Sequence, residues 1–150
     1  MGELVQIKYG KNQTKVLDAK GKVPIYGTGG LMGFSREALF NKPSVLIGRK
    51  GSISKVKYVD HPFWTVDTLF YTEVDENKVL PRFLYYLLSQ IDFYQYNEGT
   101  TIPSLRVETL NRLEFEIPEL LVQKQIVGIL DRLDDKIELN NQINDYLSVA

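Results

Sequence analysis

The segment that follows Pro118 constrains the architecture of this chain most. It contains no proline, and Gly128 is its only glycine. Residues at alternating spacings of four and three along it form the seam typical of a coiled coil; they are Ile126, Leu130, Leu133, Ile137, Asn140, Asn144 and Leu147. A helix of about 30 residues is about 45 Å long, which exceeds the width of so small a domain. We therefore expect a long C-terminal helix that projects in part and pairs with a companion helix.

Two seam positions, Asn140 and Asn144, are polar. Buried asparagines lower the stability of a coiled coil but fix its register and the number of paired helices. This pattern favours a specified pairing such as a homodimer. A helix that lies on its own domain remains an alternative, because a second apolar stripe widens the seam; it runs through Ile129, Leu139, Ile143 and Tyr146.

The residues before Pro118 have the patterns of a β-rich body. Short apolar or alternating runs between glycines and polar residues predict strands; they cover residues 4–8, 23–26, 44–47, 52–59, 63–72 and 113–117. The run 63–72 has aromatic residues on both faces, which favours a central strand. Apolar residues at helical spacing after Pro81 predict an amphipathic helix packed on the sheet. The predicted fold class is α+β, with a body of residues 1–118 and a helical arm of residues 119–150.

Charge is distributed unevenly along the chain, although the net charge is only −1. Eleven basic and three acidic residues lie up to Lys57, whereas seven basic and sixteen acidic residues follow. Such an asymmetry suggests that one part of the protein faces a polyanion. Two ordinary solvated surfaces would be an equally simple explanation.

The residue types that catalysis needs are missing or isolated. The chain has no cysteine and its only histidine is His61, so a metal site or a serine triad would lack essential groups. We expect His61 to be a structural or surface residue. Residues 27–33 lack the Gly-Lys-Ser/Thr of a phosphate loop, and Asp67 and Asp75 have no evident carboxylate partner. We predict no catalytic residue, bound metal or cofactor, no membrane span, and the cytoplasm as the default location.

Duplex DNA offers phosphate charge and base edges, and three polar segments supply groups for both. The first is a glycine turn whose amides can approach a phosphate; its candidates are Tyr26, Thr28, Gly29, Arg36 and Lys42. The second is a predicted hairpin with Arg49 and Lys50 at its tip; its candidates are Arg49, Lys50, Ser52 and Lys55, with Lys57 along the following strand. The third is a polar loop with Thr100, Thr101, Ser104 and Arg106. A solvated turn is the simpler explanation for any one segment, but their joint occurrence favours DNA binding.

The same segments carry a resemblance to a known family, the target-recognition domain of type I restriction-modification specificity subunits. The matching runs are Pro24-Ile25-Tyr26-Gly27-Thr28-Gly29-Gly30, Ser44-Val45-Leu46-Ile47-Gly48-Arg49-Lys50-Gly51-Ser52 and Pro62-Phe63-Trp64-Thr65-Val66-Asp67-Thr68-Leu69-Phe70. Gly99-Thr100-Thr101-Ile102-Pro103-Ser104-Leu105 matches the family's Gly-Ser-x-x-Pro-Ser-Leu loop. Residues 117–134 resemble the start of its helical region. The resemblance covers nearly the whole chain.

The resemblance implies a non-catalytic reader of double-stranded DNA that directs methylation subunits, and possibly restriction subunits, to a bipartite target. Those partners would use S-adenosylmethionine and extrude the target adenine. Family members usually carry two recognition domains, whereas this chain ends at Ala150 within one helix. It is therefore either a half-subunit that pairs with itself or a piece of a longer chain. A coiled-coil scaffold or inhibitor that binds those subunits without reading DNA is the alternative function.

Overall fold

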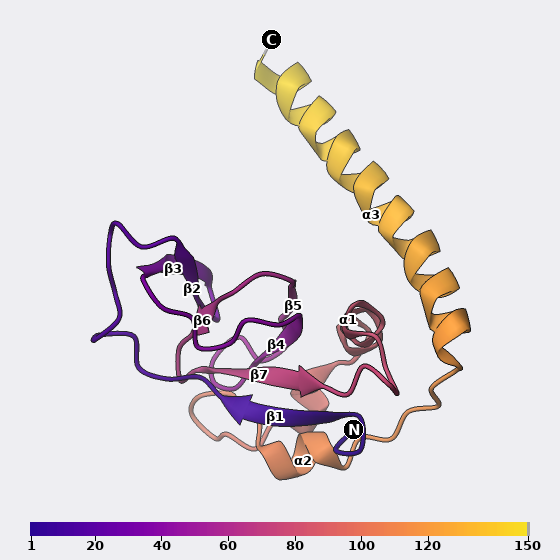
Figure 1. The fold of residues 1–150 in the computed structure, drawn as a ribbon, viewed down its shortest axis with the longest axis horizontal. Helices are drawn as coiled ribbons and strands as arrows, with labels where there is room; N and C mark the ends of the chain where they lie inside the picture. Colours follow the sequence, from indigo (N-terminus) through magenta and orange to yellow (C-terminus); the bar gives the residue numbers. More distant parts are fainter. Residues whose placement is uncertain (150) are drawn as a thin grey trace.

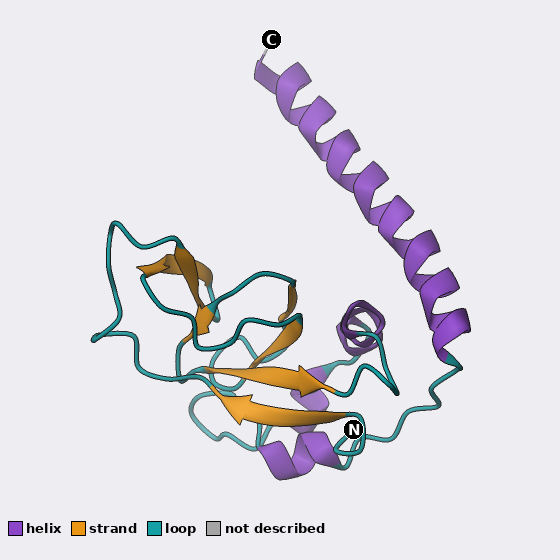
Figure 2. Cartoon of the chain, in the orientation of Figure 1, coloured by secondary structure: helices purple, strands orange, loops and turns teal. Residues whose placement is uncertain are grey.

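The computed structural model describes residues 1–149 of the chain. The described part has a body of two small β-sheets with short helices, and one long helix that leaves this body (Figure 1). Coloured by secondary structure, the strands all lie within the body and the projecting arm is entirely helical (Figure 2). The predicted α+β class with a β-rich globule and a long C-terminal helix is confirmed.

The larger sheet has the strand order β1-β7-β4-β5, and each neighbouring pair is antiparallel. Its strands are β1 (Val5–Tyr9), β7 (Leu69–Val74), β4 (Ser44–Gly48) and β5 (Val56–Val59). Strand β4 is buried along its whole length, as its uninterrupted apolar run predicts. At one end of this sheet β1 and β4 finish while β5 and β7 begin, and we call it the loop end. We call the opposite end, where β7 finishes, the helix end.

The smaller sheet has the order β3-β2-β6. Strand β2 (Val23–Gly27) forms a hairpin with β3 (Gly30–Ser35) and pairs in parallel with the short β6 (Trp64–Thr65). Gly27 pairs with Gly30, so Thr28 and Gly29 form a two-residue turn, and Gly30 has a φ of +116° that favours glycine. The predicted glycine turn is therefore the tip of a hairpin. Strand β3 was not among the predicted strands.

The predicted single strand over residues 63–72 is wrong, because the structure divides it between the two sheets. Its first part is β6 and its last part lies in β7. Between them the chain turns, with the Leu69 amide donating to the Val66 carbonyl over 3.1 Å. The aromatic residues on both faces of the run therefore reflect a crossing from one core to another. Its second part does form a central strand, between β1 and β4.

Helix α1 (Pro81–Ser89) confirms the predicted amphipathic helix, with Pro81 in its first turn. It packs on β4 and β5, and its buried Phe83, Leu84 and Leu88 join the main core. The short helices η1 (Phe93–Tyr96) and α2 (Val107–Asn111) were not predicted. Their buried Phe93 and Leu110 enter the same core, which holds these short segments in place.

The predicted strand over residues 113–117 is wrong. This segment has no secondary structure, although Leu113 is buried and Phe115 and Ile117 are half-buried against the main core. Glu114 and Glu116 point to solvent. The alternation of apolar and charged residues in this segment thus arises because one side of an extended chain faces the core and the other faces solvent. It does not require a hydrogen-bonded neighbouring strand.

Helix α3 (Leu120–Val149) begins two residues after Pro118. Its first turns touch the body, with Ile126 and Val127 against the main core. From Asp135 to Leu147 every residue is exposed. The prediction that part of the helix projects is therefore confirmed, whereas the division into domains at 118/119 stays a prediction. No helix in the described residues is long and apolar enough to cross a membrane.

The predicted seam is half-buried at Ile126 and Leu130 and solvent-exposed farther on. Leu133, Ile137 and Leu147 are 49%, 57% and 65% exposed. The competing stripe, formed by Ile129, Leu139, Ile143 and Tyr146, is exposed as well. Both apolar faces of the projecting part are therefore open to a companion chain, and the pairing itself stays a prediction.

Candidate nucleic-acid interface

The second and third predicted segments lie side by side at the loop end. The Gly51 amide donates to the Pro103 carbonyl and the Leu105 amide to the Arg49 carbonyl, both over 2.9 Å, and Lys50 forms a β-bridge with Ser104. Gly51 has a φ of +83°, which lets the chain turn between these contacts. The connection from β4 to β5 and the loop before α2 therefore form one continuous surface.

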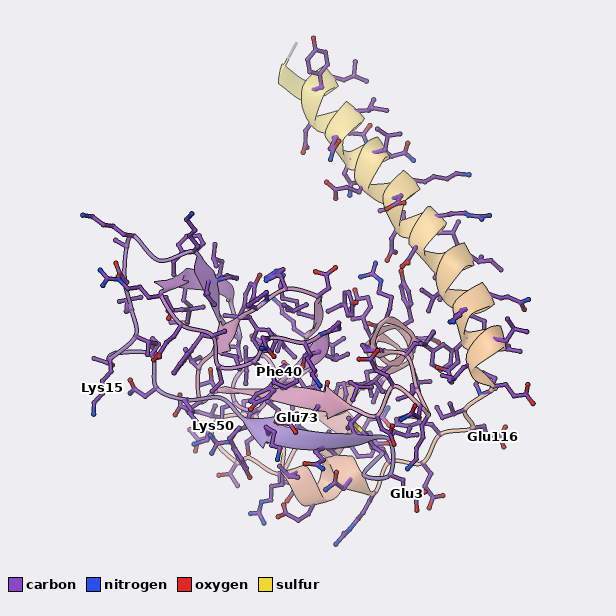
Figure 3. The ribbon with its side chains drawn as sticks, in the orientation of Figure 1. Glu3, Lys15, Phe40, Lys50, Glu73 and Glu116 are labelled. Atoms are coloured by element: carbon purple, nitrogen blue, oxygen red, sulfur yellow. The ribbon has the colours of Figure 1, made fainter. Side chains whose placement is uncertain are left out.

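Arg49 and Lys50 differ in how freely their side chains can bind a ligand. The Arg49 guanidinium donates to the Asp67 carbonyl over 2.7 Å and lies 5.2 Å from the centre of the Tyr9 ring. Lys50 is exposed and extends from the loop end in Figure 3. Arg49 thus has a fixed orientation and Lys50 is the freer cation, although both were predicted at the tip of the hairpin.

Asn97 organises the third segment, and sequence reasoning did not assign it this role. Its side-chain oxygen accepts hydrogen bonds from the amides of Gly99 and Ser104, both over 2.9 Å. The exposed Thr100 and Thr101 lie between these two anchors. An asparagine followed by a glycine two residues later is typical of a side chain that closes its own turn, and this signal could have identified Asn97.

Arg106 lies at the end of the same loop and has a partner. Its Nε is 3.1 Å from Oε2 of Glu98, and both groups belong to the loop. The Arg106 side chain remains largely exposed, so the pair leaves it accessible while partly neutralising its charge. Arg106 therefore contributes less net charge to the loop end than an unpaired cation would.

The glycine turn reaches the same end of the sheet and borders a pocket of about 200 Å³. Leu46, Val56 and Leu69 contribute apolar side chains to its lining, and Lys55 and Lys57 contribute cations. A side chain at Gly29 or Gly30 would meet no atom within 4 Å, so the backbone of the turn is open to close approach. No ion pair involves Lys50, Lys55 or Lys57 among the side chains that the structure describes.

Tyr26 lies beneath this surface and is only 8% exposed. Burial raises the pKa of its hydroxyl, and the charge of Asp60 adds to this effect. The hydroxyl is 3.3 Å from Nε2 of His61, while Lys57 Nζ is 5.0 Å from the centre of the ring. The Tyr26 ring therefore packs against the ammonium group of Lys57. The predicted direct contact of Tyr26 with DNA stays a prediction. His61 is exposed, and its expected structural or surface role stays a prediction.

The sequence analysis placed Arg36 and Lys42 at the glycine turn, but in the structure they lie away from it. Arg36 forms an ion pair with Asp18. Lys42 borders a pocket with Glu3, Glu73 and Asp75 at the helix end of β7, whereas Lys50 lies beside Thr68 at the loop end. The five residues of β4 lie between Lys42 and Lys50, and an extended strand of this length spans about 17 Å. Nearness in the sequence was misleading because β3 carries the chain away from the turn.

Two of the basic side chains lie apart from two of the acidic ones in the structure. Lys15 and Lys50 lie toward the side of the body away from α3, and Glu3 and Glu116 lie toward the base of α3 (Figure 3). The loop after β1, which starts at the loop end, adds Lys11, Lys20 and Lys22. The described residues contain no group of three or more histidine, cysteine, aspartate or glutamate side chains that could hold a metal ion.

Known proteins resemble this chain along nearly its whole length. The specificity subunit of the type I restriction enzyme HindI from Haemophilus influenzae is 36% identical over 91 residues, which are 56% of this chain and 20% of that subunit. The EcoprrI specificity subunit from Escherichia coli is 23% identical over 155 residues, covering 99% of this chain and 38% of that subunit. This chain thus spans between 20% and 38% of the length of these two relatives.

Solved structures share the fold. The S subunit of a type I restriction-modification system from M. genitalium superimposes with a TM-score of 0.78 at 22% identity, over 91% of this chain and 38% of that one. The HsdS subunit from Thermoanaerobacter tengcongensis superimposes with a TM-score of 0.65 at 15% identity, over 92% of this chain and 37% of that one. A family model described as the type I restriction modification DNA specificity domain matches residues 1–148. The chain belongs to this family.

Proposed function

We propose that this chain recognises one half of a bipartite sequence in double-stranded DNA, as the specificity component of a type I restriction-modification system. The observation that carries the proposal is the convergence of three polar segments at the loop end. The glycine turn, the β4–β5 connection and the loop of residues 97–106 come from distant parts of the sequence. They form one surface with the exposed Lys50, Lys55 and Lys57, which make no ion pair with the side chains that the structure describes.

This surface has both kinds of group that a sequence reader needs. Lysines and open backbone amides suit phosphates, which fix the position of a protein on the duplex. The hydroxyls of Thr100, Thr101 and Ser104 lie on a loop held by Asn97 and suit hydrogen bonds to base edges. Asn97 orders this loop before binding, which lowers the entropy lost when DNA is bound.

Methylation and restriction subunits would supply the catalysis, with S-adenosylmethionine bound to the methylation subunit. This chain would be non-catalytic and would act where those subunits act, in the cytoplasm. The projecting part of α3 offers apolar side chains to a second copy of this chain and to the methylation subunits. A homodimer would present two recognition surfaces related by twofold symmetry, so its target would be an interrupted palindrome.

Selection from a randomised duplex library tests the proposal, with the methylation subunit of the same system present. We expect enrichment of an interrupted palindrome, and enrichment of no sequence would refute DNA reading. Lys50→Glu should abolish the enrichment, because it reverses the charge of an exposed cation at the loop end. The control is Lys42→Glu, the same change at another exposed lysine, which lies at the helix end and should retain the enrichment.

The same variants separate the reader from a scaffold or inhibitor that only binds the other subunits. Assembly with the methylation subunit should survive Lys50→Glu under both hypotheses, because the substitution lies far from α3. DNA affinity should fall only if the chain reads DNA. For the homodimer, the mass in solution should be about twice the 17.2 kDa of one chain.

A further inference from the structure

A network of charged and aromatic side chains joins α1 to α3 at the helix end. Arg82 Nε donates to Oδ1 of Asp131 over 2.8 Å, and its Nη2 is 3.6 Å from Oδ2 of Asp134. The Tyr86 hydroxyl lies 2.6 Å from Asp131 Oδ1 and 2.7 Å from Asp134 Oδ2, and it can donate its proton to either carboxylate. One arginine and one tyrosine of α1 thus hold two carboxylates one turn apart on α3.

The Arg82 guanidinium is itself held in place by three aromatic rings. Its centre lies 4.8 Å from the ring of Tyr58, 5.3 Å from Tyr85 and 5.2 Å from Tyr86. All four members of the network are half-buried, so solvent screens them less than an exposed ion pair. The aromatic contacts restrict the guanidinium plane, and the carboxylates of α3 must therefore meet it in one orientation.

The protonation of the network suits this arrangement. Burial raises the pKa of the Tyr86 hydroxyl, and its hydrogen bonds to Asp131 and Asp134 raise it further, so it stays a donor. Burial alone would raise the pKa of Asp131, but the hydrogen bonds from Tyr86 and Arg82 and the charge of Arg82 outweigh this and lower it. Asp131 is therefore charged, and the network is fully formed, at neutral pH.

The second attachment of α3 lies nearer its start, at Gln123, whose side chain is fully buried. Its Oε1 accepts from the Leu80 amide over 2.8 Å, and its Nε2 donates to the carbonyls of Lys78 and Pro118. Eight residues, or about 12 Å of helix, separate Gln123 from Asp131. Together with Ile126 and Val127, which pack on the core between them, these two polar attachments define the direction of the helix axis.

This geometry makes the direction of α3 sensitive to the network. Leu147 lies 24 residues beyond Gln123, three times as far as Asp131 does. If α3 pivots at Gln123, a displacement of 1 Å at Asp131 becomes about 3 Å at Leu147, because a straight helix rises uniformly. Beyond Asp134 all residues up to Leu147 are exposed, so the body gives the arm no further lateral support.

We propose that Arg82, Tyr86, Asp131 and Asp134 are positioning residues that set the angle between the recognition surface and α3. Because the arms of two chains would hold two such surfaces apart, this angle fixes the number of base pairs between the half-sites that the dimer accepts. The second statement rests on the function proposed above, whereas the first concerns the geometry of this chain alone.

Distance measurements between spin labels test the first statement without DNA. The chain has no cysteine, so cysteines introduced at the exposed Glu108 in α2 and Asn141 in α3 would be the only labelling sites. Labelled chain diluted in unlabelled chain isolates the distance within one molecule. We expect a narrow distribution for the parent protein and a distribution at least twice as broad, or a mean shifted by several ångströms, for the double variant Asp131→Asn and Asp134→Asn.

Asp135→Asn is the control: it makes the same Asp-to-Asn change at one exposed neighbouring position and should leave the distribution unchanged. Tyr86→Phe keeps the ring beside Arg82 and removes only the hydroxyl, so it should broaden the distribution even if the double variant folds poorly. A parent-like distribution in the folded double variant, or in Tyr86→Phe where the double variant does not fold, would overturn the proposal.

Binding to duplexes whose half-site gap varies by single base pairs tests the second statement in the complete assembly. The parent complex should prefer one gap at least ten-fold, and Tyr86→Phe should flatten or shift that preference while affinity for a single half-site stays unchanged. An unchanged preference despite a broadened distance distribution would refute the link to spacing. If the parent complex binds none of the duplexes, the proposed function fails, whereas the positioning role is judged by the distances alone.

Discussion

Replacing Gln123 with methionine should destabilise the protein substantially, because its buried side chain satisfies three partly buried backbone groups. Its side chain accepts a hydrogen bond from the amide of Leu80, the N-cap residue of α1, whose own side chain makes no capping hydrogen bond. It also donates to the carbonyls of Lys78 and Pro118. Methionine has a similar length but would leave all three groups unpaired. Each unsatisfied buried group costs about 1–3 kcal/mol, and after partial relaxation we expect a total loss of about 3 kcal/mol in the free energy of unfolding.

Urea denaturation followed by the fluorescence of Trp64, the only tryptophan, measures this loss in the body of the protein. A loss of about 3 kcal/mol corresponds to a fall of about 1.5 M in the midpoint for a typical slope of ~2 kcal/mol per molar. Gln125→Met is the matched control at an exposed position of the same helix and should change stability by less than about 0.5 kcal/mol. Equal stabilities for the two variants would refute the interpretation of Gln123 as the anchor of α3.

Further measurements address α3 and the loop end. Gly128→Ala should stabilise the protein by about 0.5–1 kcal/mol in thermal or urea unfolding, because its added Cβ would meet no atom within 4 Å. The folded state lowers the pKa of Asp131 below its ordinary 3.8, so the charged carboxylate should stabilise the protein above that pH. This stabilisation should be lost as the pH falls through the folded-state pKa. The difference in unfolding free energy between the parent and Asp131→Asn, measured by urea denaturation, should therefore shrink at low pH. Ile137→Asp should return the mass in solution to the 17.2 kDa of one chain if α3 mediates the dimer. Lys55→Ala should reduce the slope of log affinity against log salt by about 0.9 if this lysine contacts a phosphate.

Patterns that depend on helical period predicted α1 and α3 correctly. The amphipathic repeat after Pro81 and the long proline-free segment after Pro118 both correspond to helices. The spacing of apolar residues along a helix depends only on residues a few positions apart, so it can be recognised without knowing what the helix packs against. The split of residues 63–72 between two sheets was not visible, because a strand's partners lie far away in the sequence. The same reason explains why the alternation at residues 113–117 was mistaken for a strand.

The sequence predicted the separate segments of the candidate site, but it did not predict how they contact one another. The β4–β5 connection and the 97–106 loop were recognised as polar segments, but their contact through Gly51 and Pro103 depends on tertiary structure. Arg36 and Lys42 were grouped with the glycine turn only because they follow it in the sequence. The network of Arg82, Tyr86, Asp131 and Asp134 was not predicted, since each of these residues is ordinary on the exposed face of a helix. Only the packing of α1 against α3 brings them together.

The two ends of β7 separate the surface proposed to recognise DNA from the residues proposed to position α3. Its first residue, Leu69, borders the pocket of the loop end, while the segment after its last residue leads to Lys78 and Leu80, which bind Gln123 of α3. Between them β7 is a central strand, paired on both sides and largely buried. Closely packed interiors resist deformation, so this strand holds the loop end and the base of α3 at a fixed separation. Loop residues such as Thr100 and Thr101 can therefore change without moving α3, and the angle of α3 can change without altering the loops.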